Sequence, residues 1–161
     1  MNNETLKKRL DEFLQTHYEG RSGSFVGSDV GALKMGDLEQ VRKLLTSFLA
    51  DIPYSMRRKE TERERERYFH YTFYLLMRMV SCYTVYTEKQ QSEGRVDCIV
   101  ETLNYIYIFE FKLDGTADEA LQQIEDKGYA RPYEADSRKL FKVGTVFSSE
   151  TGTISEFTVS D

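Results

Sequence analysis

The chain has 161 residues, of which 40% are hydrophobic and 30% are charged. This composition predicts one folded domain with a substantial core and excludes wholesale disorder. The formal net charge is −5, which excludes a strongly basic nucleic-acid binder but not a local basic patch. Acidic and basic residues are equal in number up to residue 112, so the whole imbalance lies in residues 113–161. We expect that acidic part to face away from any anionic substrate.

The sequence carries no pattern of membrane insertion or export. No apolar run is long enough to span a bilayer, and the N-terminal segment lacks a signal-peptide core. Cys82 and Cys98 without an export signal predict reduced thiols in a cytoplasmic protein. Neither cysteine, nor the isolated His17 and His70, has the spacing of a zinc site. We therefore expect a cytoplasmic protein that does not associate with membranes.

The first third of the chain has a helical pattern interrupted by a polar stretch. Apolar spacing predicts a helix over residues 4–18, and the Gly- and Ser-rich residues 19–36 predict a connector. A second helix is predicted from Asp37, which has the position of an N-cap. We interpret residues 1–56 as a helical appendage and residues 57–161 as the main domain.

A charged run opens the main domain. Residues 57–67 contain six basic and four acidic side chains and continue into an apolar stretch, which together predict one long helix over residues 58–80. The run is typical of a solvated helix face with ion pairs between successive turns. Contact with a phosphate backbone is the alternative interpretation.

After residue 82 the apolar period changes from that of a helix to that of strands. The predicted elements are strands over residues 83–89, 95–102 and 105–112, a helix over 116–127, and strands over 139–147 and 155–159. Thr116 and Glu119 predict a capping box at the start of this helix, and Gly128 predicts its end. The order predicts an α/β (α+β) mixed sheet, in which three strands form a meander and the fourth returns through a crossover helix.

The second and third strands form the informative hairpin. Only Leu103–Asn104 separates them, which predicts a two-residue turn. That turn would place Asp97 opposite Glu110 and Arg95 opposite Lys112, with Glu110 and Lys112 on one face of the strand. The other face of the third strand carries aromatic side chains, namely Tyr107, Phe109 and Phe111.

Two carboxylates on opposed strands repel each other unless something compensates their charge. A divalent cation is the natural compensation for Asp97 and Glu110, and their oxygen ligands suit Mg²⁺ or Mn²⁺. Lys112 beside that ion would polarise an attacking water or stabilise charge on a phosphate. Surface salt bridges are the alternative, since a Glu-x-Lys triplet recurs at residues 125–127 on a predicted helix.

These residues resemble a known signature. Asp97, followed thirteen positions later by Glu110–Phe111–Lys112, resembles the D…ExK motif of the PD-(D/E)XK nuclease superfamily. The predicted α-β-β-β-α-β order over residues 60–160 is similar to its restriction-endonuclease-like core. The segments Gly94–Asp97 and Tyr107–Lys112 are further similar to a bacterial branch that usually lies C-terminal to an AAA-ATPase-like domain. That resemblance implies that this chain is a fragment of a longer protein.

The resemblance implies roles residue by residue. Asp97 and Glu110 match the metal-binding acids, and Lys112 matches the catalytic lysine. Glu66 resembles the helix glutamate that completes the metal shell, with Glu62 and Glu64 as competitors. Gln123 resembles a glutamine beside the catalytic site, or else is a helix-surface amide. Glu88 is either a further ligand or a strand-surface residue.

The resemblance therefore implies a Mg²⁺- or Mn²⁺-dependent nuclease that hydrolyses phosphodiester bonds of nucleic acid, with DNA as the expected substrate. The alternative is a catalytically inactive nuclease-fold module that serves protein or nucleic-acid interaction beside an ATPase domain. The acidic pI favours that alternative because nonspecific affinity for DNA should be weak.

Overall fold

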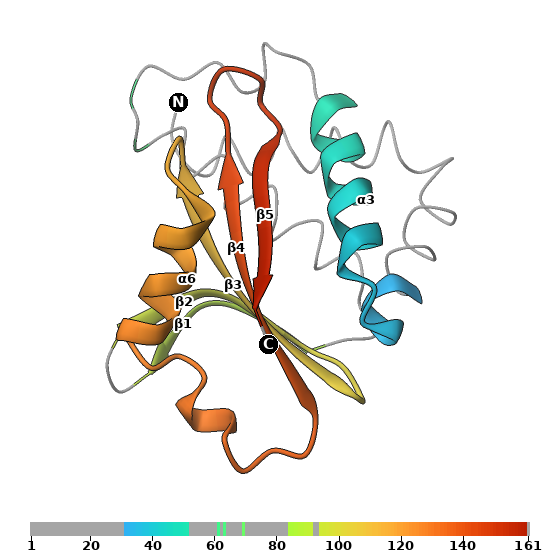
Figure 1. Ribbon diagram of the computed structural model, residues 1–161, viewed down its shortest axis with the longest axis vertical. Helices are drawn as coiled ribbons and strands as arrows, with labels where there is room; N and C mark the ends of the chain where they lie inside the picture. Colours follow the sequence, from blue (N-terminus) through green and yellow to red (C-terminus); the bar gives the residue numbers. More distant parts are fainter. Residues whose placement is uncertain are drawn as a thin grey trace.

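The structure, a computed structural model, describes residues 31–51, 61, 63, 69, 84–91 and 94–160 (Figure 1). The elements are α3 (Leu38–Asp51), β1 (Thr84–Gln91), β2 (Gly94–Glu101), β3 (Tyr105–Leu113), α6 (Ala117–Asp126), a 3₁₀ helix (Arg131–Tyr133), β4 (Lys139–Phe147) and β5 (Ile154–Ser160). The helix expected over residues 4–18 lies outside the described residues. So does most of the one expected over 58–80, of which Arg63 and Phe69 are described as helical.

One mixed sheet organises the described residues. Its five strands follow the chain order β1-β2-β3-β4-β5. Neighbouring strands are antiparallel except β3 and β4, which are parallel over their whole length from Tyr105–Lys139 to Leu113–Phe147. A parallel pair needs a crossover, and α6 supplies it. The predicted mixed sheet with a meander and a crossover helix is therefore confirmed.

The β2–β3 hairpin has the predicted register. The Thr102 N–H donates to the Tyr105 carbonyl at 2.8 Å across the two-residue turn, and the paired residues run from Glu101–Ile106 to Cys98–Phe109. The ladder ends at Cys98–Phe109 among the described residues, so neither the predicted pairing of Asp97 with Glu110 nor that of Arg95 with Lys112 belongs to it. Side chains take over the backbone hydrogen bonds from that point, as described below.

Helix α6 begins and ends as its sequence predicts. The Thr116 hydroxyl accepts a hydrogen bond from the Glu119 N–H at 3.1 Å, and Gly128 ends the helix with a φ of +61°. That conformation lets the Tyr129 N–H donate to the Ile124 carbonyl at 3.1 Å, the closing bond of a Schellman motif. Its buried residues recur three and four positions apart, at Ala117, Ala120 and Ile124. This stripe packs α6 onto the sheet.

The two faces of the sheet have different cores. Facing α6, aliphatic side chains of β2 and β3 (Ile99, Ile106 and Ile108) cluster with Ile124. On the other face, β3 carries an aromatic row of Tyr105, Tyr107, Phe109 and Phe111, with successive ring centroids 6.1–6.4 Å apart. Such aromatic pairs contribute about 0.5–1.5 kcal/mol each beyond burial. Together these cores hold β3 in the centre of the fold.

The segment before α3 corrects one prediction. Residues 31–35, expected to belong to a connector, are helical, and Ala32 and Leu33 are buried. The Leu33 carbonyl accepts a hydrogen bond from the Tyr107 hydroxyl, which holds this turn against the aromatic face. Asp37 caps α3 by accepting from the Gln40 N–H at 3.1 Å, as predicted. Figure 1 shows α3 and α6 flanking the sheet on opposite sides.

Candidate active site

Two carboxylates occupy the point where β2 and β3 stop pairing. The Phe111 N–H donates to Asp97 Oδ2 at 2.9 Å, and the Asp97 N–H donates to Glu110 Oε2 at 3.5 Å. Each carboxylate thus accepts a backbone hydrogen bond from the opposite strand, in place of the carbonyl that a regular ladder would supply. The ladder opens here because the side chains, rather than the main chains, bridge the strands.

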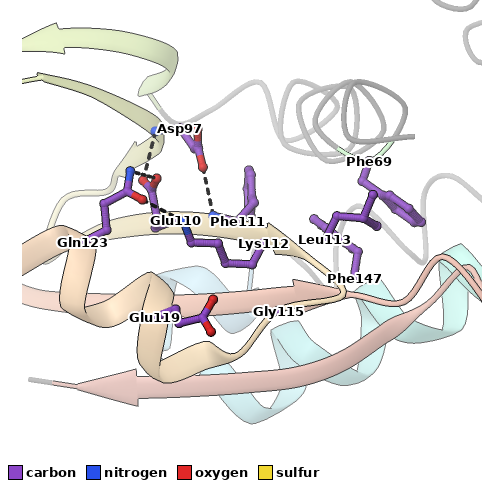
Figure 2. Close-up of a pocket in the computed structure, with 10 residues that line it drawn as sticks. All are labelled: Phe69, Asp97, Glu110, Phe111, Lys112, Leu113, Gly115, Glu119, Gln123 and Phe147. Carbon is purple, nitrogen blue, oxygen red and sulfur yellow. Dashed lines mark hydrogen bonds between the residues drawn. The ribbon is translucent and has the colours of Figure 1, made fainter. Parts of the chain in front are cut away.

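Helix α6 reaches this point through one side chain. Gln123 Nε2 donates to Glu110 Oε1 at 2.5 Å, and Lys112 Nζ donates to Gln123 Oε1 at 2.8 Å (Figure 2). The amide therefore links the acid and the lysine of β3, whose side chains share the face that packs on α6. Gln123 fixes the lysine ammonium beside the carboxylate without a direct ion pair between them.

The electrostatics of the acid pair favour a positive partner. Burial of Glu110, which is only 3% exposed, is the largest cause that raises the pKa of its carboxyl above the ordinary value, and the nearby Asp97 charge adds to it. Burial and a like charge both disfavour a second negative charge. A proton or a cation between the two groups would relieve this cost. Carboxylate oxygens of this kind suit a hard divalent ion such as Mg²⁺ or Mn²⁺.

The site opens into a pocket of about 270 Å³. One wall is polar and comprises Asp97, Glu110, Lys112, Gly115, Glu119 and Gln123; the other is apolar and comprises Phe69, Phe111, Leu113 and Phe147. Phe69 stacks on Phe147 with ring centroids 4.7 Å apart, and Phe147 also meets Phe111. Charged groups therefore face a restricted volume with one aromatic wall, as Figure 2 shows.

The structure brings four predicted site residues together, namely Asp97, Glu110, Lys112 and Gln123. The acids expected from the first core helix, Glu66 with its competitors Glu62 and Glu64, lie outside the described residues, as does the side chain of Glu88. Phe69 comes from that same expected helix and lines the pocket. Within the part of the chain that the structure describes, no three His, Cys, Asp or Glu side chains gather closely enough to hold a metal ion.

Sequence reasoning missed Glu119 as a pocket residue. Its side chain lines the pocket, although the acidic stretch after residue 112 was expected to face away from the site. The capping-box pattern predicted that the Glu119 side chain would bond to the backbone of Thr116. Among the described residues, the bond between the two is instead the one from the Glu119 backbone N–H to the Thr116 hydroxyl. The sequence could have indicated this position, because Glu119 and Gln123 are four residues apart and such a spacing places both side chains on one helical face.

The basic run of residues 57–67 remains a prediction. Arg63 is exposed, and the other cations of that run lie outside the described residues. None of the helices that can be described is long and apolar enough to cross a bilayer.

Comparison with known proteins identifies the family. A sequence model of the PD-(D/E)XK nuclease superfamily matches residues 64–157. A curated protein of Azotobacter chroococcum mcd 1, named "Uncharacterized protein in vnfD 5'region", is 31% identical over 159 residues, which are 96% of this chain and 31% of that protein. The chain thus spans about a third of the length of this relative. No solved structure matches the chain. Because the superfamily match covers more than half of the sequence, the chain belongs to the PD-(D/E)XK nuclease superfamily.

Proposed function

We propose that this chain is a divalent-metal-dependent nuclease that hydrolyses phosphodiester bonds of nucleic acid. The observation that carries the proposal is the convergence of Asp97, Glu110 and Lys112 in one pocket. Two carboxylates supply a place for a cation, and a lysine adds a positive charge beside it. Membership of the superfamily supports this assignment.

The donor set fits Mg²⁺ or Mn²⁺, to be held by Asp97 and Glu110. Both side chains are carboxylates, and burial together with the nearby Asp97 charge raises the pKa of Glu110, a cost to its charged form that an ion would relieve. Glu66 stays the predicted third acid. It precedes Phe69 by three positions in the sequence, a spacing at which two side chains of a helix are neighbours on its surface. When bound, the ion would act as a Lewis acid on a phosphoryl oxygen.

Lys112 and Gln123 have separate roles in this proposal. A lysine ammonium has three N–H donors, and Gln123 takes one of those of Lys112. The remaining donors can position the attacking water and stabilise negative charge that develops on the phosphate. Gln123 is a positioning residue, because its amide holds Lys112 Nζ and Glu110 Oε1 in one arrangement.

The substrate contacts outside the pocket are proposed from charge. Arg95 lies two residues before Asp97 on β2 and is exposed, so it is available to a phosphate. The basic residues of 57–67 are further candidates. DNA is the substrate that the family resemblance favours, and an AAA-ATPase-like domain is the partner it suggests.

Oligonucleotide cleavage tests the proposal. Purified chain should cleave labelled DNA or RNA in Mg²⁺ or Mn²⁺ and should not cleave it in EDTA. Asp97→Asn should abolish cleavage, and Lys112→Ala should lower kcat by about 10²–10³-fold, the usual effect of removing one charge-stabilising donor. Lys127→Ala is the matched control, because Lys127 is the exposed lysine of the second Glu-x-Lys triplet and lies outside the pocket. Cleavage that survives in Asp97→Asn and Lys112→Ala would refute the assignment.

Calorimetry separates the enzyme from the alternative, a nuclease-fold module that binds without cleaving. The net charge of −5 favours that alternative, since it predicts weak nonspecific affinity for a polyanion. If the site is a metal centre, Mn²⁺ should bind to the wild type and not to Glu110→Gln. Absence of Mn²⁺ binding by the wild type would favour the interaction module.

A further inference from the structure

Glu119 is the one acidic side chain of α6 that lines the pocket. It lies four residues before Gln123, so both side chains belong to the same face of the helix. One helical turn separates them by about 6 Å along the axis. Figure 2 shows the Glu119 carboxylate beside Gly115, on the same side of the pocket as Lys112.

The fold does not use this carboxylate. The Glu119 N–H completes the cap with Thr116, but within the described part of the chain the Glu119 carboxylate accepts no hydrogen bond and forms no ion pair. Two other acids of α6 are engaged: Glu125 pairs with Lys142, and Asp126 accepts from Gln122 at 2.8 Å. Asp118, like Glu119, is exposed and has no such partner among the described residues, but it lies outside the pocket. Glu119 therefore presents a free hydrogen-bond acceptor to the pocket.

Gly115 lies beside this acceptor and lines the same pocket. A Cβ at position 115 would lie 3.0 Å from Glu119 Oε2 and 3.2 Å from the Lys112 Cβ. The φ of Gly115 is not in the left-handed region, so backbone conformation does not require glycine there. Gly115 therefore lies between the proposed phosphate-binding Lys112 and the Glu119 carboxylate.

The chemistry of the Glu119 carboxylate determines which group of a substrate can bind beside it. Glu119 does not gather with Asp97 and Glu110 into a three-acid cluster, so it is not placed to share their ion. A carboxylate repels a phosphate, but it accepts hydrogen bonds from hydroxyl groups, and acidic residues commonly hold sugar hydroxyls in nucleotide sites. In a nucleic acid, the hydroxyl groups nearest to a phosphate are those at the 2′ and 3′ positions of the adjoining sugar.

We infer that Glu119 is a specificity-determining residue that accepts a hydrogen bond from a sugar hydroxyl of the substrate strand. The inference rests on the proposed nuclease function. Two hydroxyls have this chemistry: the 2′-hydroxyl of a ribonucleotide and the terminal 3′-hydroxyl of a DNA strand. The first makes the chain selective for RNA, and the second makes it selective for strand ends.

Three single-stranded oligonucleotides of one sequence distinguish these sources. They are an RNA that ends in a 3′-deoxynucleotide, a DNA with a free 3′-hydroxyl, and a DNA that ends in a dideoxynucleotide. Fluorescence anisotropy in Ca²⁺ gives the Kd of each, and cleavage is measured separately in Mn²⁺. The wild type should bind one of the first two about 10- to 100-fold more tightly than the third, as one hydrogen bond to a charged group provides.

Glu119→Ala, which removes the acceptor, should remove most of that preference while its circular dichroism spectrum stays that of the wild type. Asp118→Ala is the matched control, because it removes an exposed carboxylate one position away, outside the pocket. It should leave the preference unchanged. Preference for the RNA identifies the 2′-hydroxyl, and preference for the unblocked DNA identifies the 3′-hydroxyl.

Equal Kd values for the three oligonucleotides in the wild type would overturn the inference. So would a preference that survives in Glu119→Ala, or one that Asp118→Ala also removes. Hydroxyl-dependent binding without cleavage in Mn²⁺ would refute the proposed hydrolysis but support the role of Glu119. Cleavage with equal Kd values for the three oligonucleotides would support the proposed hydrolysis but refute the role of Glu119. Absence of binding to all three oligonucleotides would overturn both the proposed function and the role of Glu119.

Discussion

Gly144 offers the sharpest test of how the fold holds the site. It lies on β4 directly beside Glu110 of β3, and a Cβ added there would lie 2.6 Å from the Ala117 carbonyl oxygen and 3.2 Å from Leu121 Cγ. The Ala117 carbonyl belongs to the backbone of the first turn of α6, so it cannot rotate away. The φ of Gly144 is not in the left-handed region. Space alone therefore explains the glycine.

The structure gives the size of the effect of Gly144→Ala. To restore an ordinary contact of 3.4 Å, α6 must move by about 0.8 Å from the sheet. Overpacking against a rigid group costs about 2–3 kcal/mol, and the lower chain entropy of alanine offsets about 1 kcal/mol of it. The expected net loss of stability is about 1–2 kcal/mol. The same shift would stretch the 2.8 Å bond between Lys112 and Gln123 past hydrogen-bond range.

Urea denaturation measures the first consequence. With a slope of about 2 kcal/mol per molar, the midpoint of Gly144→Ala should fall by about 0.5–1 M. Gly31→Ala is the control, because its Cβ would meet nothing within 4 Å in a helical segment. It should be neutral or stabilising by up to about 1 kcal/mol. If the chain cleaves nucleic acid as proposed, Gly144→Ala should also lower kcat by about 10- to 100-fold. An unchanged midpoint for Gly144→Ala would refute the steric reasoning.

Three other substitutions have defined outcomes. Thr116→Ala removes the N-cap of α6 and should cost about 1 kcal/mol in urea denaturation, whereas full stability would show that the cap is dispensable. Tyr129→Phe deletes the hydroxyl that donates to the Arg95 carbonyl at 3.0 Å and should cost about 1 kcal/mol by the same measurement; no change would mean that water replaces the bond. The hydrogen bonds from Arg138 lower the pKa of Asp136 to about 2 in the folded chain, so the stabilisation is present above the unfolded value near 3.8 and is lost as the pH falls toward 2. Asp136→Asn should therefore flatten the dependence of Tm on pH between about 4 and 2, and an unaltered slope would contradict the assignment.

The register of the β2–β3 hairpin could be predicted because a two-residue turn leaves one way to pair the two strands. With only Leu103–Asn104 between the strands, the pairing of Cys98 with Phe109 follows from counting. The alternation of aromatic and other residues along β3 likewise predicted its two faces. These features depend on neighbours in sequence, where local rules are strong.

The end of the ladder could not be predicted from the same counting. Nothing in the sequence distinguishes a strand pair that continues past Cys98 from one in which Asp97 and Glu110 intercept the backbone N–H groups. The helical turn of residues 31–35 was hidden by the glycines and serines around it, because its stability comes from burial of Leu33 under the sheet. Tertiary contacts decided both cases.

The interrupted ladder explains why this site needs so strong a frame. Burying the Glu110 carboxylate beside Asp97 opposes folding, since burial and the neighbouring charge both disfavour its charged form. The strand that carries Glu110 is held on its other edge by an unbroken parallel pairing with β4, and beneath by the aromatic row that continues to Phe141 and Phe147. These contacts lie outside the pocket's polar wall and offset the cost of the acid pair. The rigidity of β3 thus keeps Glu110 beside Asp97 rather than letting the two carboxylates move apart.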